Sequence, residues 1–257
     1  MDLRLTGRTA VVVGSTSGLG EAIAIALGRE GAKVVITGRR KELAERLAGT
    51  LPRAIGVGLD ISEQSSIESV MSTAEARFGG VDILVLNSGG PPPVTAVDLD
   101  PQVLLSALDT LLIRQIAFVA RVLPAMRRQR WGRILAVGSS GIQEPLSNLV
   151  ISNVGRTALA AYLKTLAMEV MEDGVTVNMV LPGRIDTARV AGLDGVRAER
   201  LGIAPSLVRQ QSEQLIPARR YGRPDEFGAI ACFLCSELAS YVTGEQIRVD
   251  GGLARGY

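Results

Sequence analysis

The chain has 257 residues, of which 47% are hydrophobic and 21% are charged, a composition typical of a globular protein with a large core. The net charge of +2 is too small to predict binding to nucleic acid, and the absence of histidine excludes Ser-His-Asp and Cys-His catalysis. Without histidine or a cysteine cluster, we expect no metal site. We also find no signal peptide and no uninterrupted apolar stretch of membrane-spanning length, so we expect a cytoplasmic protein without a membrane partner.

Short apolar runs alternate along the chain with longer segments of helical periodicity. Predicted strands cover residues 9–13, 33–37, 54–58, 82–86, 133–137, 176–180 and 246–249. Predicted helices cover residues 19–30, 40–49, 62–78, 101–129, 148–172 and 224–238. Strands that are apolar almost throughout and alternate with helices predict an α/β fold, in which a parallel sheet carries helices on both faces. No linker or repeat divides the chain, so a single domain should span residues 1–257.

A glycine-rich turn follows the first predicted strand. Its sequence is Gly14-Ser15-Thr16-Ser17-Gly18-Leu19-Gly20. Gly14 permits a sharp turn, Gly18 removes a Cβ where phosphates could approach the backbone, and Gly20 allows close contact between helix and strand. The unpaired N–H groups and the positive end of the helix dipole favour an anion here. The Gly-x3-Gly-x-Gly spacing differs from the usual dinucleotide fingerprint, so a turn that binds nothing is the alternative at this point.

Small, polar and turn-forming residues also follow the other predicted strands. They are Thr37-Gly38-Arg39-Arg40, Asp60, Asn87-Ser88-Gly89-Gly90, Gly138-Ser139-Ser140 and Pro182-Gly183-Arg184-Ile185-Asp186-Thr187. The carboxyl ends of parallel strands meet at one edge of the sheet, where ligands bind near the switch in strand order. Together these segments predict a nucleotide-binding crevice.

In order and spacing, these segments and the tail Thr243–Gly252 resemble the short-chain dehydrogenase/reductase family over essentially the full chain, in particular its 3-oxoacyl-[acyl-carrier-protein] reductase-like members. The resemblance implies a single-domain, Rossmann-like doubly wound fold with a seven-stranded parallel sheet. It also implies a nicotinamide cofactor, a small-molecule substrate and a homotetramer or homodimer. In such a protein Asp60 meets the adenine, Asn87 the ribose region, and Ile185 with Thr187 the nicotinamide amide.

The second predicted strand bears on the choice of cofactor. An acid at its end would bind the ribose 2′-hydroxyl of NAD, but here Arg39 and Arg40 follow and no acid occurs before Glu42. Guanidinium groups pair well with a 2′-phosphate, so we expect NADP (NADPH), with hydroxyl contacts from Ser15 or Thr16. Two solvated arginines are the alternative. The expected cofactor-binding residues are Gly14, Ser15, Thr16, Ser17, Gly18, Leu19, Gly20, Arg39, Arg40, Asp60, Ile61, Asn87, Ser88, Gly89, Arg156, Pro182, Gly183, Ile185 and Thr187.

The catalytic positions depart from the family pattern. These enzymes carry Tyr-x-x-x-Lys about thirteen residues after a catalytic serine, and counting from Ser139 places Ser152 and Arg156 at those two positions. The spacing still directs both side chains to the crevice. A serine hydroxyl is shorter and far less acidic than a phenol, and a guanidinium stays charged. The family's helix-borne Asn also falls near Leu111. We therefore name Ser139, Ser152 and Arg156 as the candidate catalytic residues.

Two functions from different classes follow from this departure. The first is an NADP-dependent oxidoreductase that transfers a hydride to or from a carbonyl or alcohol, with a water held by Ser152, Asn153 or Arg156 as proton relay. The second is a catalytically silent NADP(H)-binding sensor or scaffold. Non-redox chemistry, such as a lyase or dehalogenase activity, is a third alternative.

The sequence also predicts the roles of the long segment 188–220 and of the two cysteines. The long segment 188–220 is predicted to form a substrate lid, and its arginines either face an acidic substrate or are solvated. Cys232 and Cys235 form a C-x-x-C pair inside an apolar helical pattern, which predicts two core residues rather than a redox dithiol.

Overall fold

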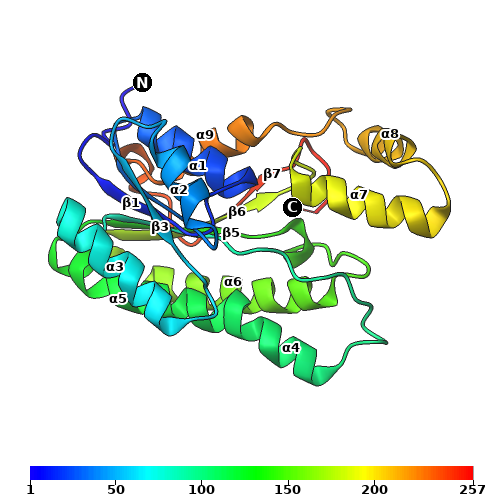
Figure 1. Ribbon diagram of the computed structural model, residues 1–257, viewed down its shortest axis with the longest axis horizontal. Coiled ribbons are helices and arrows are strands. Elements are labelled where there is room, and N and C mark those ends of the chain that lie inside the picture. The colour runs from blue at the N-terminus through cyan, green and yellow to red at the C-terminus, as the bar shows by residue number, and fades with distance from the viewer. Residues whose placement is uncertain (257) are drawn as a thin grey trace.

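The computed structural model describes residues 1–256, which form one seven-stranded parallel sheet between two layers of helices (Figure 1). The strand order is β3-β2-β1-β4-β5-β6-β7. The strands are β1 (Thr9–Val12), β2 (Lys33–Gly38), β3 (Ala54–Gly58), β4 (Ile83–Leu86), β5 (Gly132–Val137), β6 (Val175–Pro182) and β7 (Gln246–Val249). All seven predicted strands are confirmed, and the predicted fold class with them. The order reverses between β1 and β4, which opens a crevice at their carboxyl ends.

Helices occupy all six segments in which the periodicity predicts them, and two more lie in the segment expected to be a lid. They are α1 (Gly18–Arg29), α2 (Lys41–Ala48), α3 (Gln64–Phe78), α4 (Pro101–Leu108), α5 (Arg114–Arg128), α6 (Val150–Val170), α7 (Ala188–Leu201), α8 (Pro205–Leu215) and α9 (Pro224–Leu234). Short 3-10 turns occupy Ser140–Ile142, Met171–Asp173 and Glu237–Ala239. Helices α1, α2 and α9 cover one face of the sheet, and α3, α5 and α6 cover the other (Figure 1).

Successive side chains of the central strands point to opposite faces of the sheet, so the core has two parts. In β1, Val11 points to the layer of α3, α5 and α6, whereas Ala10 and Val12 point to the layer of α1, α2 and α9. All three side chains are fully buried. A strand buried on both faces needs apolar side chains at every position, which is why these strands are continuous apolar runs rather than alternating ones.

The predicted helix 101–129 contains a break that the sequence pattern does not reveal. A π-helical turn, Asp109–Ile113, separates α4 from α5, and Leu111 within it is buried. The window of highest hydropathy in Pro101–Arg128 is as long and apolar as a membrane-spanning segment, with 22% of it buried. The expectation that no such segment exists is therefore wrong. That expectation counted only uninterrupted apolar runs, whereas the mean hydropathy of a window stays high when it contains an isolated charged residue. Helices that pack on a protein core also meet this criterion, so the evidence for a membrane is weak.

Candidate active site

The glycine-rich turn between β1 and α1 has the backbone geometry that its spacing predicts. Gly14 and Gly18 have φ values of +60° and +62°, in the left-handed region that favours glycine. A Cβ on Gly20 would lie 2.4 Å from the carbonyl oxygen of Gly14, so only glycine fits there. Asn87, at the end of β4, donates from Nδ2 to that same oxygen at 2.9 Å. The two strands on either side of the crevice are thus joined at the turn.

Two hydroxyl residues of this turn have different surroundings. Ser15 is fully buried, and its Oγ donates to the Val12 carbonyl at 2.7 Å and accepts the Thr37 N–H at 2.9 Å. Its hydroxyl therefore stabilises the turn and cannot also contact a ligand, contrary to the sequence-based expectation. Thr16 lies against Gly38 at the end of β2, since a Cβ on Gly38 would be 2.8 Å from Thr16 Oγ1. Thr16 is partly exposed and lines neither cavity of the crevice, so its contact with a cofactor stays a prediction.

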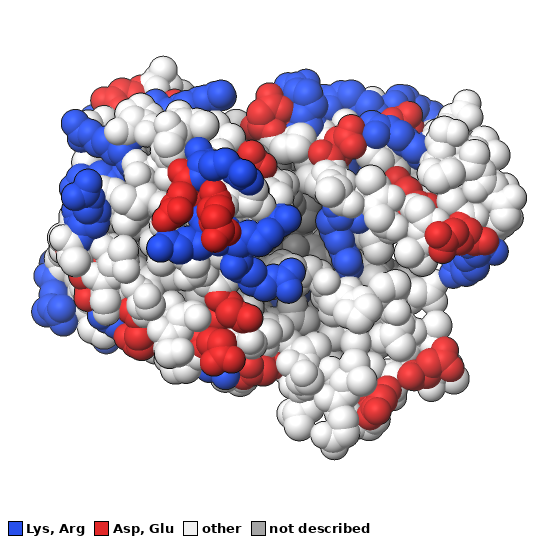
Figure 2. Space-filling model, in the orientation of Figure 1, with Lys and Arg blue, Asp and Glu red and all other residues white. Residues whose placement is uncertain are grey.

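Two adjoining cavities make up the crevice. The inner cavity, of about 490 Å³, brings together the glycine turn, the ends of β4, β5 and β6, and the start of α6 and α7. The outer cavity, of about 760 Å³, lies between the ends of β2 and β3 and helix α4. Ser88, Gly89 and Gly90 line both cavities. Figure 2 shows Lys and Arg side chains gathered around the hollow in the middle of this face.

The outer cavity has Arg39, Asp60 and Ile61 in its wall. Hydrogen bonds from Ser62 lower the pKa of the Asp60 carboxyl, and the positive charge of Arg39 lowers it further, so Asp60 is ionised at neutral pH. Arg40 is exposed and occupies the N-cap position of α2, outside the residues that line either cavity. The structure thus separates two arginines that the sequence analysis treated as one pair.

Ser139 follows β5 and lines the inner cavity. Its Oγ accepts the N–H of Gly141 at 3.1 Å, which caps the 3-10 turn Ser140–Ile142. Because the oxygen serves as an acceptor there, the hydroxyl proton is left to donate. The backbone thus fixes the position of a donor at the floor of the cavity.

Ser152 and Arg156 both face the inner cavity from the first turns of α6, as their spacing predicts. They are 8% and 7% exposed, respectively. Within residues 1–256, the Ser152 hydroxyl makes no hydrogen bond. Arg156 donates from Nη1 to the Val137 carbonyl at 2.7 Å and from Nη2 to the Ser88 carbonyl at 3.3 Å. Burial, and to a lesser degree the charge of Arg189, lowers the pKa of Arg156 to about 10.

The neighbours of these residues on α6 have structural roles. Asn153 donates from Nδ2 to the Leu146 carbonyl at 3.0 Å and holds the loop before α6, and it does not line the inner cavity. The expectation that Asn153 could hold a water in the crevice is not supported by this geometry. Leu111 packs against α6, where a Cβ on Gly155 would lie 2.7 Å from its Cδ1. An apolar side chain therefore occupies the position expected for a helix-borne Asn.

The segment 188–220 folds into α7 and α8 beside the crevice. Arg184 pairs with the buried Asp194 of α7, and Tyr221 donates from its hydroxyl to Asp194 at 2.7 Å. At the start of α7, Arg189 donates from Nη2 to the Pro91 carbonyl at 2.8 Å, across the mouth of the inner cavity. Sequence reasoning grouped Arg189 with the other arginines of the lid, because its place in the cavity wall depends on how α7 packs. A third cavity of about 350 Å³ adjoins the inner one under α7.

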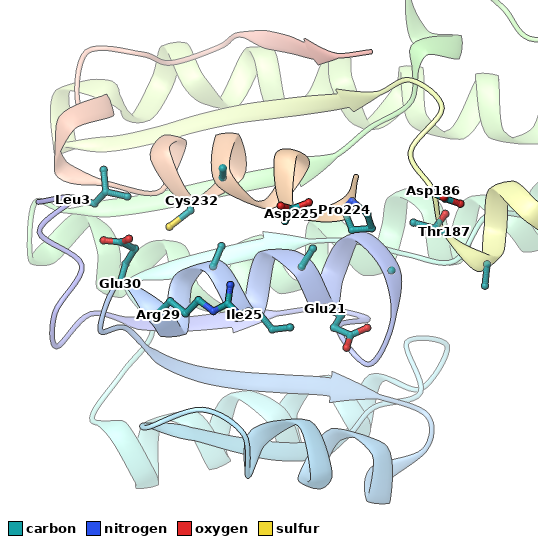
Figure 3. Close-up of a pocket in the computed structure, with 15 residues that line it drawn as sticks. Leu3, Glu21, Ile25, Arg29, Glu30, Asp186, Thr187, Pro224, Asp225 and Cys232 are labelled. Atoms are coloured by element: carbon teal, nitrogen blue, oxygen red, sulfur yellow. The ribbon is translucent and has the colours of Figure 1, made fainter. Parts of the chain in front are cut away.

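Cys232 and Cys235 are core residues, as predicted. Both thiols are free and buried, and burial raises the pKa of Cys232 to about 12 and that of Cys235 further still. A groove of about 750 Å³ beside α1 and α9 has Cys232 in its wall (Figure 3). Its other lining is mainly apolar, with Glu21, Arg29 and Asp225 among its charged residues, and none of the candidate catalytic residues reaches it.

Sheet order, glycine turn and crevice together define a dinucleotide-binding α/β protein of the doubly wound type. An enoyl-(acyl carrier protein) reductase family model matches residues 13–254. The chain belongs to the short-chain dehydrogenase/reductase family.

Its relatives match it over nearly their whole length. The 3-oxoacyl-[acyl-carrier-protein] reductase of Aquifex aeolicus is 33% identical over 264 residues, covering 98% of this chain and all of the relative. D-beta-hydroxybutyrate dehydrogenase of Cupriavidus necator is 34% identical, covering 96% of this chain and 98% of the relative. Among solved structures, L-sorbose reductase of Gluconobacter frateurii, complexed with NADPH and L-sorbose, has a TM-score of 0.93 at 30% identity, with complete coverage of both chains. An NADPH-dependent reductase of bacilysin biosynthesis has a TM-score of 0.91 at 27% identity, covering 97% of this chain and 99% of that one.

Proposed function

We propose that this protein is an NADP-dependent oxidoreductase that transfers a hydride between NADP(H) and a carbonyl or alcohol substrate. The observation that carries the proposal is the crevice itself, in which the glycine turn, Arg39 and Ser139 line adjoining cavities. When bound, NADPH supplies the hydride. Two structural relatives, the NADPH-dependent reductase of bacilysin biosynthesis and the NADPH-bound L-sorbose reductase, support this choice of cofactor.

The residues present fit a dinucleotide. The turn at Gly14 and Gly18 leaves its backbone open to phosphates, and the N-terminus of α1 favours their negative charge. Arg39, in the wall of the outer cavity beside the ionised Asp60, would pair with a 2′-phosphate, with Thr16 near it. Ile185 and Thr187 line the inner cavity, where they would contact the nicotinamide amide.

Three side chains of the inner cavity would handle the substrate oxygen. Ser139 would donate its free proton to that oxygen, since its own oxygen already accepts from Gly141. The Ser152 hydroxyl would hold a water that relays a proton to or from solvent. Arg156, with a pKa of about 10, stays protonated at neutral pH and would stabilise negative charge on the substrate rather than exchange a proton.

A screen of aldehydes, ketones and oxo acids with NADPH tests this function through the loss of absorbance of the reduced nicotinamide. The proposal expects turnover with at least one class of carbonyl, reduced about 100-fold or more in Ser139→Ala. A carbonyl screen in which the wild type does no better than Ser139→Ala would contradict it.

A catalytically silent NADP(H)-binding protein is the second candidate. The hydrogen bonds of Arg156 to the Val137 and Ser88 carbonyls favour it, because they give the guanidinium a structural role. The double variant Ser152→Tyr with Arg156→Lys separates the two functions. Reductase activity that arises only in the double variant would identify the natural protein as silent.

A further inference from the structure

The inner cavity has an unbalanced charge. Among its 24 lining residues are two arginines, Arg156 and Arg189, and neither an aspartate nor a glutamate. Across residues 1–256, no carboxylate lies within 4.0 Å of either guanidinium. Both instead donate to backbone carbonyls, those of Val137, Ser88 and Pro91.

Burial of Arg156 costs hydration free energy, and no carboxylate of the described residues compensates for it. At 7% exposed, its guanidinium is largely removed from water, and neutral carbonyl oxygens compensate for only part of the lost hydration. The partly buried Arg184, in the wall of the adjoining cavity under α7, has the usual arrangement, since it pairs with Asp194. Arg156 is thus a buried cation without a counter-ion.

Arg189 approaches the same space from the opposite wall. It leaves α7 and reaches the loop after β4, where a Cβ on Gly90 would lie 2.7 Å from its Nη2. Its charge is close enough to contribute to the lowered pKa of Arg156. Two like charges that face one cavity repel each other, and an anion between them would stabilise both.

The proposed cofactor does not supply that anion. Its phosphates would lie at the glycine turn and beside Arg39, whereas the reduced nicotinamide that would face Ser139 is uncharged. The negative charge must then arrive with the substrate. We propose that the substrate is an oxo acid, whose carboxylate pairs with Arg156 and Arg189 while its carbonyl oxygen meets Ser139. Planar guanidinium groups bind a carboxylate through two parallel hydrogen bonds, which also orients the adjoining carbonyl. This inference rests on the proposed function.

The adjoining cavity of about 350 Å³ indicates what the rest of the substrate resembles. It shares Leu146, Leu149, Val190 and Leu193 with the inner cavity, and Leu253 of the C-terminal segment also lines it. Its remaining lining includes three arginines, Arg184, Arg197 and Arg200. The side of this cavity that adjoins the inner one is apolar, which favours a hydrocarbon chain next to the carboxylate and carbonyl of the acid. The substrate class is thus a 2-oxo or 3-oxo acid with a short aliphatic chain.

The first test measures binding without turnover. Hexanoate and methyl hexanoate, which lack a reducible ketone, are titrated into the enzyme loaded with NADPH, and affinity is followed by calorimetry. Hexanoate should bind about tenfold or more tightly than its ester. Arg189→Met should bring the two affinities close together, Arg189→Lys should retain part of the difference, and Arg53→Met, an exposed arginine outside the crevice, should retain all of it. Equal affinities for the two probes in the wild type would overturn the inference. A loss of NADPH affinity in Arg189→Met as large as its loss of hexanoate affinity would also overturn it.

The second test measures turnover of 2-oxohexanoate, 3-oxohexanoate and their methyl esters with NADPH. A preference for an acid over its ester that falls in Arg189→Met supports the inference and the proposed function together. Turnover of acids and esters at equal rates supports the proposed function and overturns the oxo-acid inference. If hexanoate binds more tightly than its ester but no oxo compound is turned over, the cavity binds a carboxylate. That result would contradict the proposed oxidoreductase function and the assignment of an oxo acid as its substrate.

Discussion

Two hydrogen bonds join the guanidinium of Arg209 to the carboxylate of Asp186, with Nη1–Oδ1 at 3.2 Å and Nη2–Oδ2 at 2.9 Å. They connect α8 with the segment that leaves β6 beside the crevice. Arg209 also pairs with Glu213 and lies 4.6 Å from the ring centre of Tyr221. One side chain thus links α8 to the segment that follows β6.

Replacing Arg209 with Met should loosen α8 with little effect on global stability. The pair is exposed, so we expect the free energy of unfolding to fall by less than about 1 kcal/mol. Local opening should increase, and hydrogen exchange of backbone amides in α8 should become several-fold faster. Arg223→Met removes a comparable exposed ion pair outside the lid and is the control. Unchanged exchange in α8 would show that the ion pair does not hold the lid.

Arg39→Ala should weaken NADPH binding about tenfold or more, because a charge-assisted hydrogen bond contributes about 1.5–3 kcal/mol. Affinity for NADH, which lacks the 2′-phosphate, should change far less. Arg40→Ala should have a smaller effect, since Arg40 lies outside the cavity wall, and Arg46→Ala on the same helix should have none. Fluorescence titration with both nucleotides measures the ratio of NADPH affinity to NADH affinity for each variant. Equal losses for NADPH and NADH would contradict a role for Arg39 at the 2′-phosphate.

Gly20→Ala should damage both stability and nucleotide binding. The added methyl would meet the Gly14 carbonyl oxygen at 2.4 Å and Asn87 Nδ2 at 2.8 Å, so the turn must shift. We expect a loss of about 1–3 kcal/mol in urea denaturation and a marked loss of NADPH affinity. Gly192→Ala in α7 is the matched control, because its methyl would meet no atom within 4 Å, and it should gain up to about 1 kcal/mol. If Gly20→Ala left both the free energy of unfolding and the NADPH affinity unchanged, the turn would adapt more easily than its packing indicates.

The two buried thiols predict a pH dependence of stability. Burial raises the pKa of Cys232 to about 12, while a thiol in the unfolded chain titrates near 8.5. Above that lower pKa the unfolded state releases protons that the folded state keeps, so the thiols stabilise the fold fully below pH 8 and their contribution declines as pH rises toward 12.

Urea denaturation between pH 8 and pH 10.5 measures this decline. The double variant Cys232→Ala with Cys235→Ala should lose less stability over that interval than the wild type. Thiol reagents at pH 8 should label neither residue in the folded protein and both in urea. Rapid labelling of the folded protein would contradict the burial of the pair.

Much of the fold followed from local patterns. The strands Ala54–Gly58 and Gln246–Val249 match their predicted bounds, since each places an Ile and a Val two positions apart between turn residues, the alternation of a strand. The π turn Asp109–Ile113 was not predicted, because its apolar periodicity is close to that of an ordinary helix. The helices α7 and α8 were expected only as a lid, since glycines and prolines obscure their periodicity.

Within the site, residue types and spacings along the chain were enough to predict the glycine turn, the crevice, and the direction of Ser152 and Arg156. The turn and the direction of the two α6 side chains depend on neighbours within a few positions, and the crevice follows from the rule that the carboxyl ends of parallel strands meet at one edge of the sheet. The hydrogen-bond partners of Ser15, the separation of Arg39 from Arg40, and the position of Arg189 across from Arg156 emerged only from the folded chain. Each depends on contacts between segments far apart in sequence, where packing selects the partner and local propensity has no influence.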